Sequence, residues 1–256
     1  MEVVTETTHR GRPAPLVIAS GGASADAPGH TIAAFEAAIR EGADALAVQV
    51  RLSRDGHPVV FGHPRLERAT DGRGAPGAHT VRELKRLDAG GGTAARFKGQ
   101  RIQTLQEVLE RFRDVVDLWV EPCPDREDGA RLEERVVSTL EIYDALERCG
   151  VWSADLEALD RVRSLDPDVR LGIIWPEGAP RPSLATLRNG EVLRVPASSL
   201  TKETVEMVQG AGFRCCAETA DEPALVDRLV GWRVDALATG RPGVVRTRVD
   251  RLRSLG

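Results

Sequence analysis

The chain has 256 residues, of which 41% are hydrophobic and 29% charged, and its formal net charge is −4. This length fits one α/β barrel or at most two small domains, and the composition is typical of a globular protein with a full hydrophobic core. The small negative charge argues against a general attraction for nucleic acid, and no apolar stretch is long enough for a transmembrane segment.

The beginning of the chain is polar and contains proline, so residues 1–14 are predicted to form a flexible tail before a single domain over residues 15–256. The tail has no apolar run of the kind found in signal peptides, which favours a cytoplasmic protein. The four cysteines lack metal-ligand spacing and are predicted to be reduced thiols that serve packing.

The first regular elements form a βαβ unit. Residues 16–19 are predicted to be an apolar strand, and Thr31 can cap a helix over residues 32–41. Apolar residues then alternate with others over residues 45–50, which is typical of a second strand.

A hairpin follows the second strand. A Ser-Arg-Asp-Gly turn at residues 53–56 reverses the chain into the β-branched run at residues 59–61. Folding this hairpin places Gln49 roughly opposite Phe61 and Gly62. We therefore expect the functional site beside the hairpin.

Residues 64–103 are the longest stretch without regular structure, rich in Gly and Arg, with one short helix predicted over residues 81–87. The AGGGTAARFKGQ portion of this stretch is predicted to be a flexible loop beside a pocket. Thr104 then begins a helix, and the next strand is predicted over residues 115–120, with Glu121, Pro122 and Cys123 at its end.

Strands and helices alternate through the second half of the chain. Helices are predicted at 130–148, 155–164, 201–210, 222–231 and from 242, and strands at 150–153, 170–175, 192–195, 213–217 and 234–238. With the three earlier strands these make eight parallel strands. Alternation with that count predicts an α/β fold of the TIM (β/α)8 barrel type rather than an open sheet.

The sequence around the hairpin resembles the glycerophosphodiester phosphodiesterase family. The resemblance is carried by LVIASGGASADAPGHTIAAFEAAIREGADAL before the second strand and by PRLERATDGRG after the hairpin. Similarity to this family implies a TIM barrel, a divalent metal ion and a connection over the barrel mouth by residues 64–103. The resemblance places the family's catalytic His at Ser20 and its phosphate-binding Arg at Gly21. Other residues of the family's motifs are replaced here, in chain order, by Gly29, His30, Gly62, His63, Cys123, Glu218 and Gly240.

The resemblance places the family's three acidic metal ligands at Ala47, Gln49 and Glu121, so only one carboxylate remains. A hard divalent cation needs several oxygen ligands, and a single carboxylate should hold Mg²⁺ or Ca²⁺ weakly. We therefore expect no metal and no other cofactor. A transition metal bound by His63 and Glu121, with His30 as a third ligand, is the alternative.

Residues at the C-terminal ends of the strands form the site of a TIM barrel. The candidates for acid and base steps are Glu121, Glu218, His63 and His30, and those for substrate binding are Ser20, Gln49, Cys123, Trp175 and Asp221. Plainer interpretations remain open for two of them, because Glu121 could simply pair with an arginine and His30 could cap the first helix.

Small residues at many of these positions indicate a wide pocket of low polarity. Our first hypothesis is a metal-independent enzyme that uses Glu and His for acid-base chemistry on a bulky, largely apolar small-molecule substrate. It would be a cyclase, isomerase or lyase, for example in a biosynthetic pathway. The alternatives are a non-catalytic protein that binds a ligand or a partner, and a weak phosphodiesterase with a rebuilt metal site.

Overall fold

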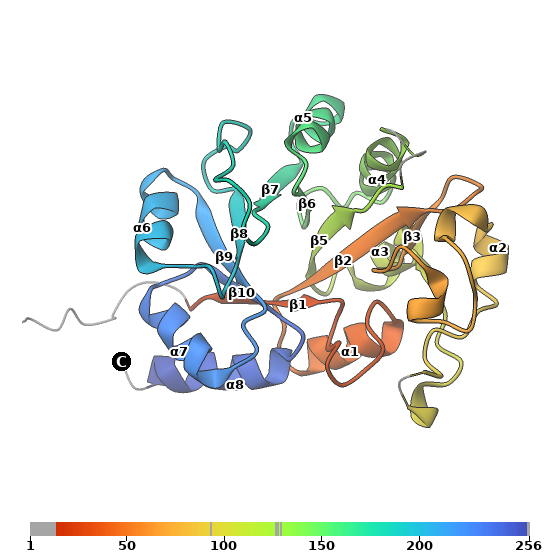
Figure 1. Ribbon diagram of the computed structural model, residues 1–256, viewed down its shortest axis with the longest axis horizontal. Coiled ribbons are helices and arrows are strands. Elements are labelled where there is room, and N and C mark those ends of the chain that lie inside the picture. The colour runs from red at the N-terminus through yellow and green to blue at the C-terminus, as the bar shows by residue number, and fades with distance from the viewer. Residues whose placement is uncertain (1–13, 93, 126–127, 129, 255–256) are drawn as a thin grey trace, which may run out of the picture.

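The computed structural model describes residues 14–254 except residues 93, 126–127 and 129. Eight parallel strands form a closed ring, because β10 pairs with β1 and β1 pairs with β2 (Figure 1). In ring order they are β1 (Leu16–Ser20), β2 (Ala45–Leu52), β5 (Asp117–Pro122), β6 (Cys149–Ser153), β7 (Arg170–Ile174), β8 (Val192–Pro196), β9 (Arg214–Glu218) and β10 (Ala236–Thr239). The predicted TIM barrel is confirmed.

Helices lie outside this ring (Figure 1). They are α1 (Ile32–Arg40), α2 (Val81–Leu84), α3 (Leu105–Phe112), α4 (Arg131–Ile142), α5 (Leu156–Leu165), α6 (Lys202–Gly210), α7 (Pro223–Gly231) and α8 (Pro242–Ser254). The helix predicted to reach residue 148 ends at Ile142, because Asp144 adopts a left-handed backbone with φ of 49° that cannot continue a helix.

The β2 strand extends beyond the ring into the predicted hairpin. Its partner β3 (Pro58–Val60) is antiparallel, with Val50 opposite Val60, and the Phe61 N–H donates to the Gln49 carbonyl at 2.9 Å. The predicted position of Gln49 opposite Phe61 is therefore confirmed. A two-residue strand, β4 (Gln103–Thr104), pairs with β3 and was too short to be predicted.

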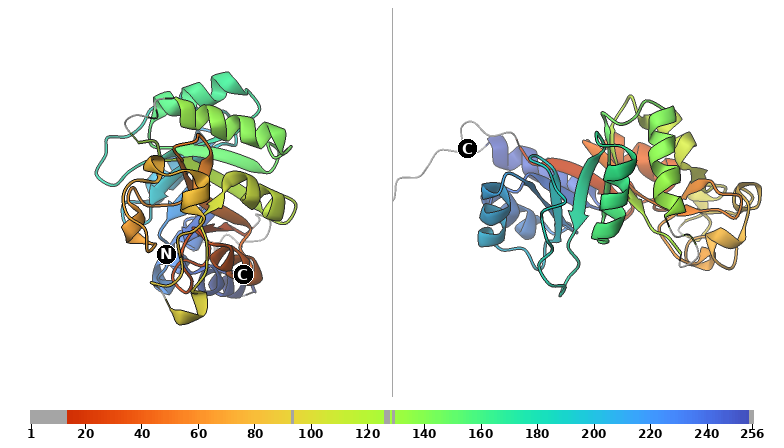
Figure 2. Two further views of the ribbon diagram at one scale, coloured as in Figure 1. Left: turned by 90° about the vertical axis from the view of Figure 1, so that its right-hand side faces the viewer. Right: turned by 90° about the horizontal axis from the view of Figure 1, so that it is seen from above.

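The segment between β3 and β4 lies at one end of the molecule, opposite α6 (Figures 1 and 2). It contains α2 and three short 3-10 helices, η1 (Leu66–Arg68), η2 (Pro76–Ala78) and η3 (Ala95–Phe97). A small apolar cluster that includes Phe61, Leu66 and Leu84 packs this segment against the hairpin. This packing fixes the segment beside the C-terminal end of β2.

Two stacked tryptophans fill much of the barrel interior. The rings of Trp119 and Trp152 lie 4.9 Å apart with an interplanar angle of 16°. A Cβ on Gly150 would lie 2.5 Å from the Trp119 ring, so the glycine makes room for this stack. The same interior cluster contains small residues such as Ala45 and Ala236, which face the bulky pair across the barrel.

The tail predicted over residues 1–14 lies, except for residue 14, outside the described residues. Within the described part of the chain, no helix has both the length and the apolar character needed to cross a membrane.

Candidate functional site

A row of polar side chains crosses the barrel mouth, by which we mean the C-terminal ends of the ring strands. Gln49 Nε2 on β2 donates to Glu121 Oε1 on β5 at 3.2 Å. Arg194 on β8 donates through Nη1 to Glu121 Oε2 at 3.2 Å and through Nη2 to Glu218 Oε1 on β9. The plainer interpretation of Glu121, pairing with an arginine, is therefore confirmed.

Arg194 is buried at the centre of this row. Its side chain is 8% exposed, and its guanidinium carbon lies 4.4 Å from the centroid of the Trp152 ring. The sequence interpretation missed it because it took Pro196 as the inward residue at the end of β8. Side chains alternate along a strand, so Arg194, two residues before Pro196, also points inward, and this periodicity could have identified it.

His30 lies beside the same row, in the loop between β1 and α1. Its backbone has a φ of 61°, and its N–H donates to the Gly21 carbonyl at 2.9 Å. Thr31 Oγ1, not His30, accepts the Ala34 N–H at the start of α1, so the helix-cap interpretation of His30 is wrong.

The His30 ring occupies space that two glycines leave free. A Cβ on Gly21 would lie 3.2 Å from His30 Nε2, and a Cβ on Gly62 would lie 2.7 Å from the same atom and 2.8 Å from Gln49 Oε1. His30 Nδ1 and Ser20 Oγ are both buried and have no hydrogen-bond partner among the described residues. The imidazole is thus held next to Gln49, and its Nδ1 can still form a hydrogen bond with a ligand.

Both histidines of this region are held in the neutral form. Burial, and secondarily the neighbouring His63, lower the pKa of His30 from 6.5 to about 4. Burial, followed by the charges of Arg68 and Arg51, lowers the pKa of His63 below its ordinary value. A neutral imidazole can accept a proton at physiological pH, as a general base must.

His30 and His63 line one pocket of about 540 Å³ between the loop before α1 and the segment after β3. The other lining residues that carry polar groups include Ser24, Glu67, Arg68, Thr70, Asp71 and Asp88, and Gly91 and Gly92 lie at its edge. Arg68 is exposed and forms no ion pair with any described residue. The pocket therefore combines two neutral imidazoles with an available guanidinium.

The acid sensitivity of the fold should depend on His30. Its pKa is about 4 in the folded chain but near 6.5 when unfolded, so the unfolded state takes up the proton first as pH falls. The contribution of neutral His30 to the free energy of unfolding is therefore fully present above about pH 6.5 and is lost as pH falls toward about 4. The full pKa shift corresponds to about 3 kcal/mol of unfolding free energy. Because His30 is partly exposed and water screens its charge, we expect a contribution of about 2 kcal/mol.

Urea unfolding at about pH 7 and about pH 4.5 measures this effect. His30→Asn should remove about 2 kcal/mol of the stability difference between the two pH values, whereas His57→Asn, which changes an exposed histidine, should not. An unchanged difference in the His30 variant would show that His30 does not carry the acid sensitivity.

The remaining predicted substrate-binding residues do not form one group. Cys123 Sγ lies 3.9 Å from Glu121 Oε1, and burial, together with Glu121, raises the pKa of its thiol to about 12, which excludes it as a ready nucleophile. Asp221 accepts hydrogen bonds from Thr239 Oγ1 at 2.5 Å and from the Gly240 N–H at 3.2 Å, a structural role. Trp175 packs against the main core, and its Nε1 donates to the Ala179 carbonyl at 2.9 Å.

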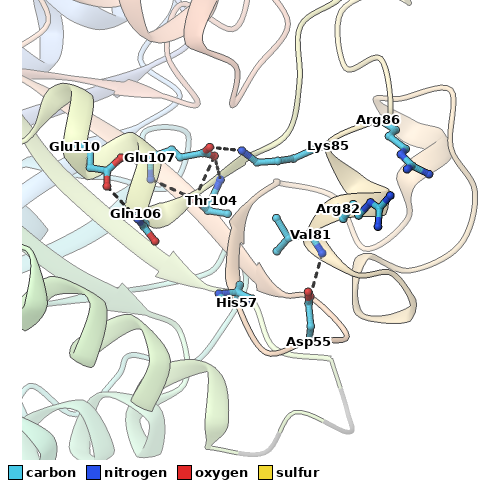
Figure 3. A pocket seen from close by; sticks show the side chains of 10 residues that line it. All are labelled: Asp55, His57, Val81, Arg82, Lys85, Arg86, Thr104, Gln106, Glu107 and Glu110. Atoms are coloured by element: carbon cyan, nitrogen blue, oxygen red, sulfur yellow. Dashed lines mark hydrogen bonds and ion pairs between the residues drawn. The ribbon is translucent and has the colours of Figure 1, made fainter.

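A larger hollow of about 760 Å³ lies outside the barrel, between α2, α3 and the β2–β3 turn (Figure 3). Lys85 pairs there with Glu107, which also accepts the Thr104 N–H at 3.0 Å and so closes the capping box of α3. Its acidic groups are thus largely engaged in structural bonds, and neither His30 nor His63 lines it. We therefore place the site in the smaller pocket.

The residues at the mouth do not fit a divalent metal ion. Both oxygens of Glu121 are engaged, Oε1 by Gln49 and Oε2 by Arg194. The described residues contain no group of three or more His, Cys, Asp and Glu side chains that could hold a metal, so the predicted alternative of His30, His63 and Glu121 is not assembled.

The fold defines an α/β-barrel protein, a class whose active sites lie at the C-terminal ends of the strands. The model of the glycerophosphoryl diester phosphodiesterase family matches residues 21–244, and the chain belongs to this family.

Several relatives are similar over nearly their whole length. A glycerophosphodiester phosphodiesterase of Caldanaerobacter subterraneus subsp. tengcongensis is 31% identical over 89% of this chain and 94% of its own. One from Bacillus subtilis is 27% identical over 89% and 84%. An Oleispira antarctica phosphodiesterase, solved in complex with the product sn-glycerol-3-phosphate, is 27% identical with a TM-score of 0.85 over 93% of this chain and 97% of its own.

These comparisons contradict our first hypothesis. A cyclase, isomerase or lyase for a bulky apolar substrate is wrong, because relatives that cover most of the chain are named as glycerophosphodiester phosphodiesterases. The hypothesis assumed a neutral mouth with unpaired Glu121 and Glu218. Arg194 instead pairs with both carboxylates, and Arg68 adds positive charge at the pocket.

Proposed function

We propose that this chain is a phosphodiesterase that cleaves glycerophosphodiesters in the pocket lined by His30, His63 and Arg68. The proposal is supported by family membership and by the product, sn-glycerol-3-phosphate, bound to the Oleispira antarctica relative. The observation that carries it is the meeting of two imidazoles of lowered pKa and a guanidinium that has no ion pair with any described residue in one pocket, between the loop before α1 and the segment after β3.

Phosphodiester hydrolysis needs a base for the attacking water, a proton for the leaving alkoxide and positive charge near the phosphoryl oxygens. His30 is the proposed base, because its ring is neutral and it is less exposed than His63. Once His30 has taken the proton of the attacking water, the resulting imidazolium would be the donor to the departing oxygen, and His63 lies exposed at the rim of the pocket. Arg68 would bind the non-bridging oxygens, since a guanidinium donates two parallel hydrogen bonds to a phosphate.

Release of sn-glycerol 3-phosphate from glycerophosphocholine or glycerophosphoethanolamine, followed by phosphorus NMR, tests this proposal. The wild type should form the product, and Arg68→Gln should raise KM about tenfold or more through loss of a charge-assisted hydrogen bond. Arg82→Gln, which changes an exposed arginine of the outer hollow, is the matched control and should leave KM unchanged.

Two results would count against the proposal. Absence of product from every glycerophosphodiester tested would show that the chain does not catalyse the proposed reaction. Equal KM values for the Arg68 and Arg82 variants would instead show that Arg68 does not bind the substrate phosphate in this pocket.

A further inference from the structure

We propose that Arg194 takes the place of a divalent cation at the barrel mouth, so that the folded chain binds no Mg²⁺, Ca²⁺ or Mn²⁺ there. The inference deepens the proposed function and rests on it for the substrate. The metal-binding experiments that test it require no turnover, so their failure can be distinguished from failure of the proposed reaction.

The guanidinium of Arg194 bridges Glu121, the one carboxylate at a metal-ligand position of the family, and a second carboxylate, Glu218. Nη1 lies 3.2 Å from Glu121 Oε2, and Nη2 pairs with Glu218 Oε1. Hard divalent cations bind carboxylate oxygens, usually two or more, to replace their hydration shell. Here one fixed positive charge already bridges a carboxylate from β5 and a carboxylate from β9.

The barrel interior holds this guanidinium in place. Its carbon lies 4.4 Å from the centroid of the Trp152 ring, and Trp152 itself is fully buried and stacked on Trp119. A cation over a desolvated aromatic face is attracted more strongly than one at the surface. Arg194 is therefore a fixed part of the barrel rather than a mobile surface charge that a metal ion could easily displace.

The neighbouring positions on β2 add no carboxylate. Gln49, whose Nε2 is bonded to Glu121 Oε1 at 3.2 Å, offers only a neutral amide oxygen, and Ala47, two residues earlier on the same strand, has no side-chain oxygen. A divalent cation entering the mouth would meet the like charge of Arg194 and would have to break its ion pair with Glu121. Removing the guanidinium should free two carboxylates within reach of one ion.

Isothermal titration with MnCl₂, MgCl₂ and CaCl₂, without substrate, tests the inference. The wild type should show no binding that depends on Glu121, as judged by comparison with Glu121→Gln. Arg194→Ala should bind Mn²⁺ about tenfold more tightly or better than the wild type, and Arg194→Ala/Glu121→Gln should lose this gain. Arg170→Ala, which removes the arginine stacked on Trp119, is the matched control and should gain nothing.

Each outcome either supports or overturns the replacement of a divalent cation by Arg194. Wild-type binding of any of the three ions that is abolished by Glu121→Gln would overturn the inference, and this comparison holds even if Arg194→Ala does not fold. A folded Arg194→Ala that binds metal no better than the wild type would also overturn it. A gain confined to Arg194→Ala and lost in the double variant would support it.

Discussion

Replacing His30 with asparagine should lower kcat/KM for a glycerophosphodiester by about a hundredfold or more, the usual contribution of a general base. Asparagine is the appropriate replacement because it tolerates the left-handed backbone that His30 adopts, with φ of 61°. His57→Asn should leave kcat/KM unchanged, since His57 lies in the outer hollow. Steady-state kinetics on the same substrate measures all three proteins.

A reciprocal exchange separates the chemistry of His30 from its packing. A Cβ on Gly62 would lie 2.7 Å from His30 Nε2, so Gly62→His alone should be destabilising and inactive. In the His30→Asn background the imidazole no longer obstructs this position, and rotation of the Gln49 side chain, whose Oε1 would lie 2.8 Å from the added Cβ, lets Gly62→His return an imidazole to the same space. We expect the double variant to recover part of the lost kcat/KM.

A fully active His30→Asn would exclude His30 as the base. A double variant that folds but stays as inactive as His30→Asn would show that an imidazole in this space is not sufficient. The rescue therefore tests position as well as residue type.

Replacing Arg194 with methionine should lower the free energy of unfolding by about 3 kcal/mol, because it leaves two largely buried carboxylates without their shared partner. Glu121 and Glu218 are only 20% and 24% exposed, so water cannot fully replace the guanidinium. Methionine keeps an apolar stem over Trp152 and limits the loss of packing. Urea unfolding with an unchanged m-value measures the effect.

The control for Arg194→Met removes the orphaned charges as well. Adding Glu121→Gln and Glu218→Gln should restore most of the lost stability, because amides are less costly to leave unpaired than carboxylates. An Arg194→Met variant as stable as the wild type would show that the ion pairs contribute little to the fold. A triple variant no more stable than the single one would assign the loss to packing on Trp152.

The barrel could be predicted because local patterns determine it. Alternating apolar strands and capped helices give eight parallel strands, and the turn at residues 53–56 fixes the position of Gln49 opposite Phe61. The end of α4 was harder to predict, since it depends on a single left-handed residue, Asp144, and not on the apolar periodicity.

The site could be predicted only in part. Gln49, His63 and Glu121 were proposed as site residues from the strand ends and His30 from the family resemblance, but their partners come from distant parts of the chain. Arg194 meets Glu121 across 73 positions in the sequence, and no local pattern indicates such a contact. The His30 ring likewise fills the space beside Gly62 through a tertiary contact, and no spacing in the sequence indicates it.

The central claim is that the histidine pocket cleaves a glycerophosphodiester while Arg194 holds the carboxylates that a metal would otherwise bind. The most direct test is wild-type release of glycerol 3-phosphate from glycerophosphocholine, with excess EDTA in one set of reactions and with Mg²⁺, Ca²⁺ or Mn²⁺ in the others. We predict the same kcat/KM in all of them. Product that appears only with added metal, or in none of the reactions, would contradict the account.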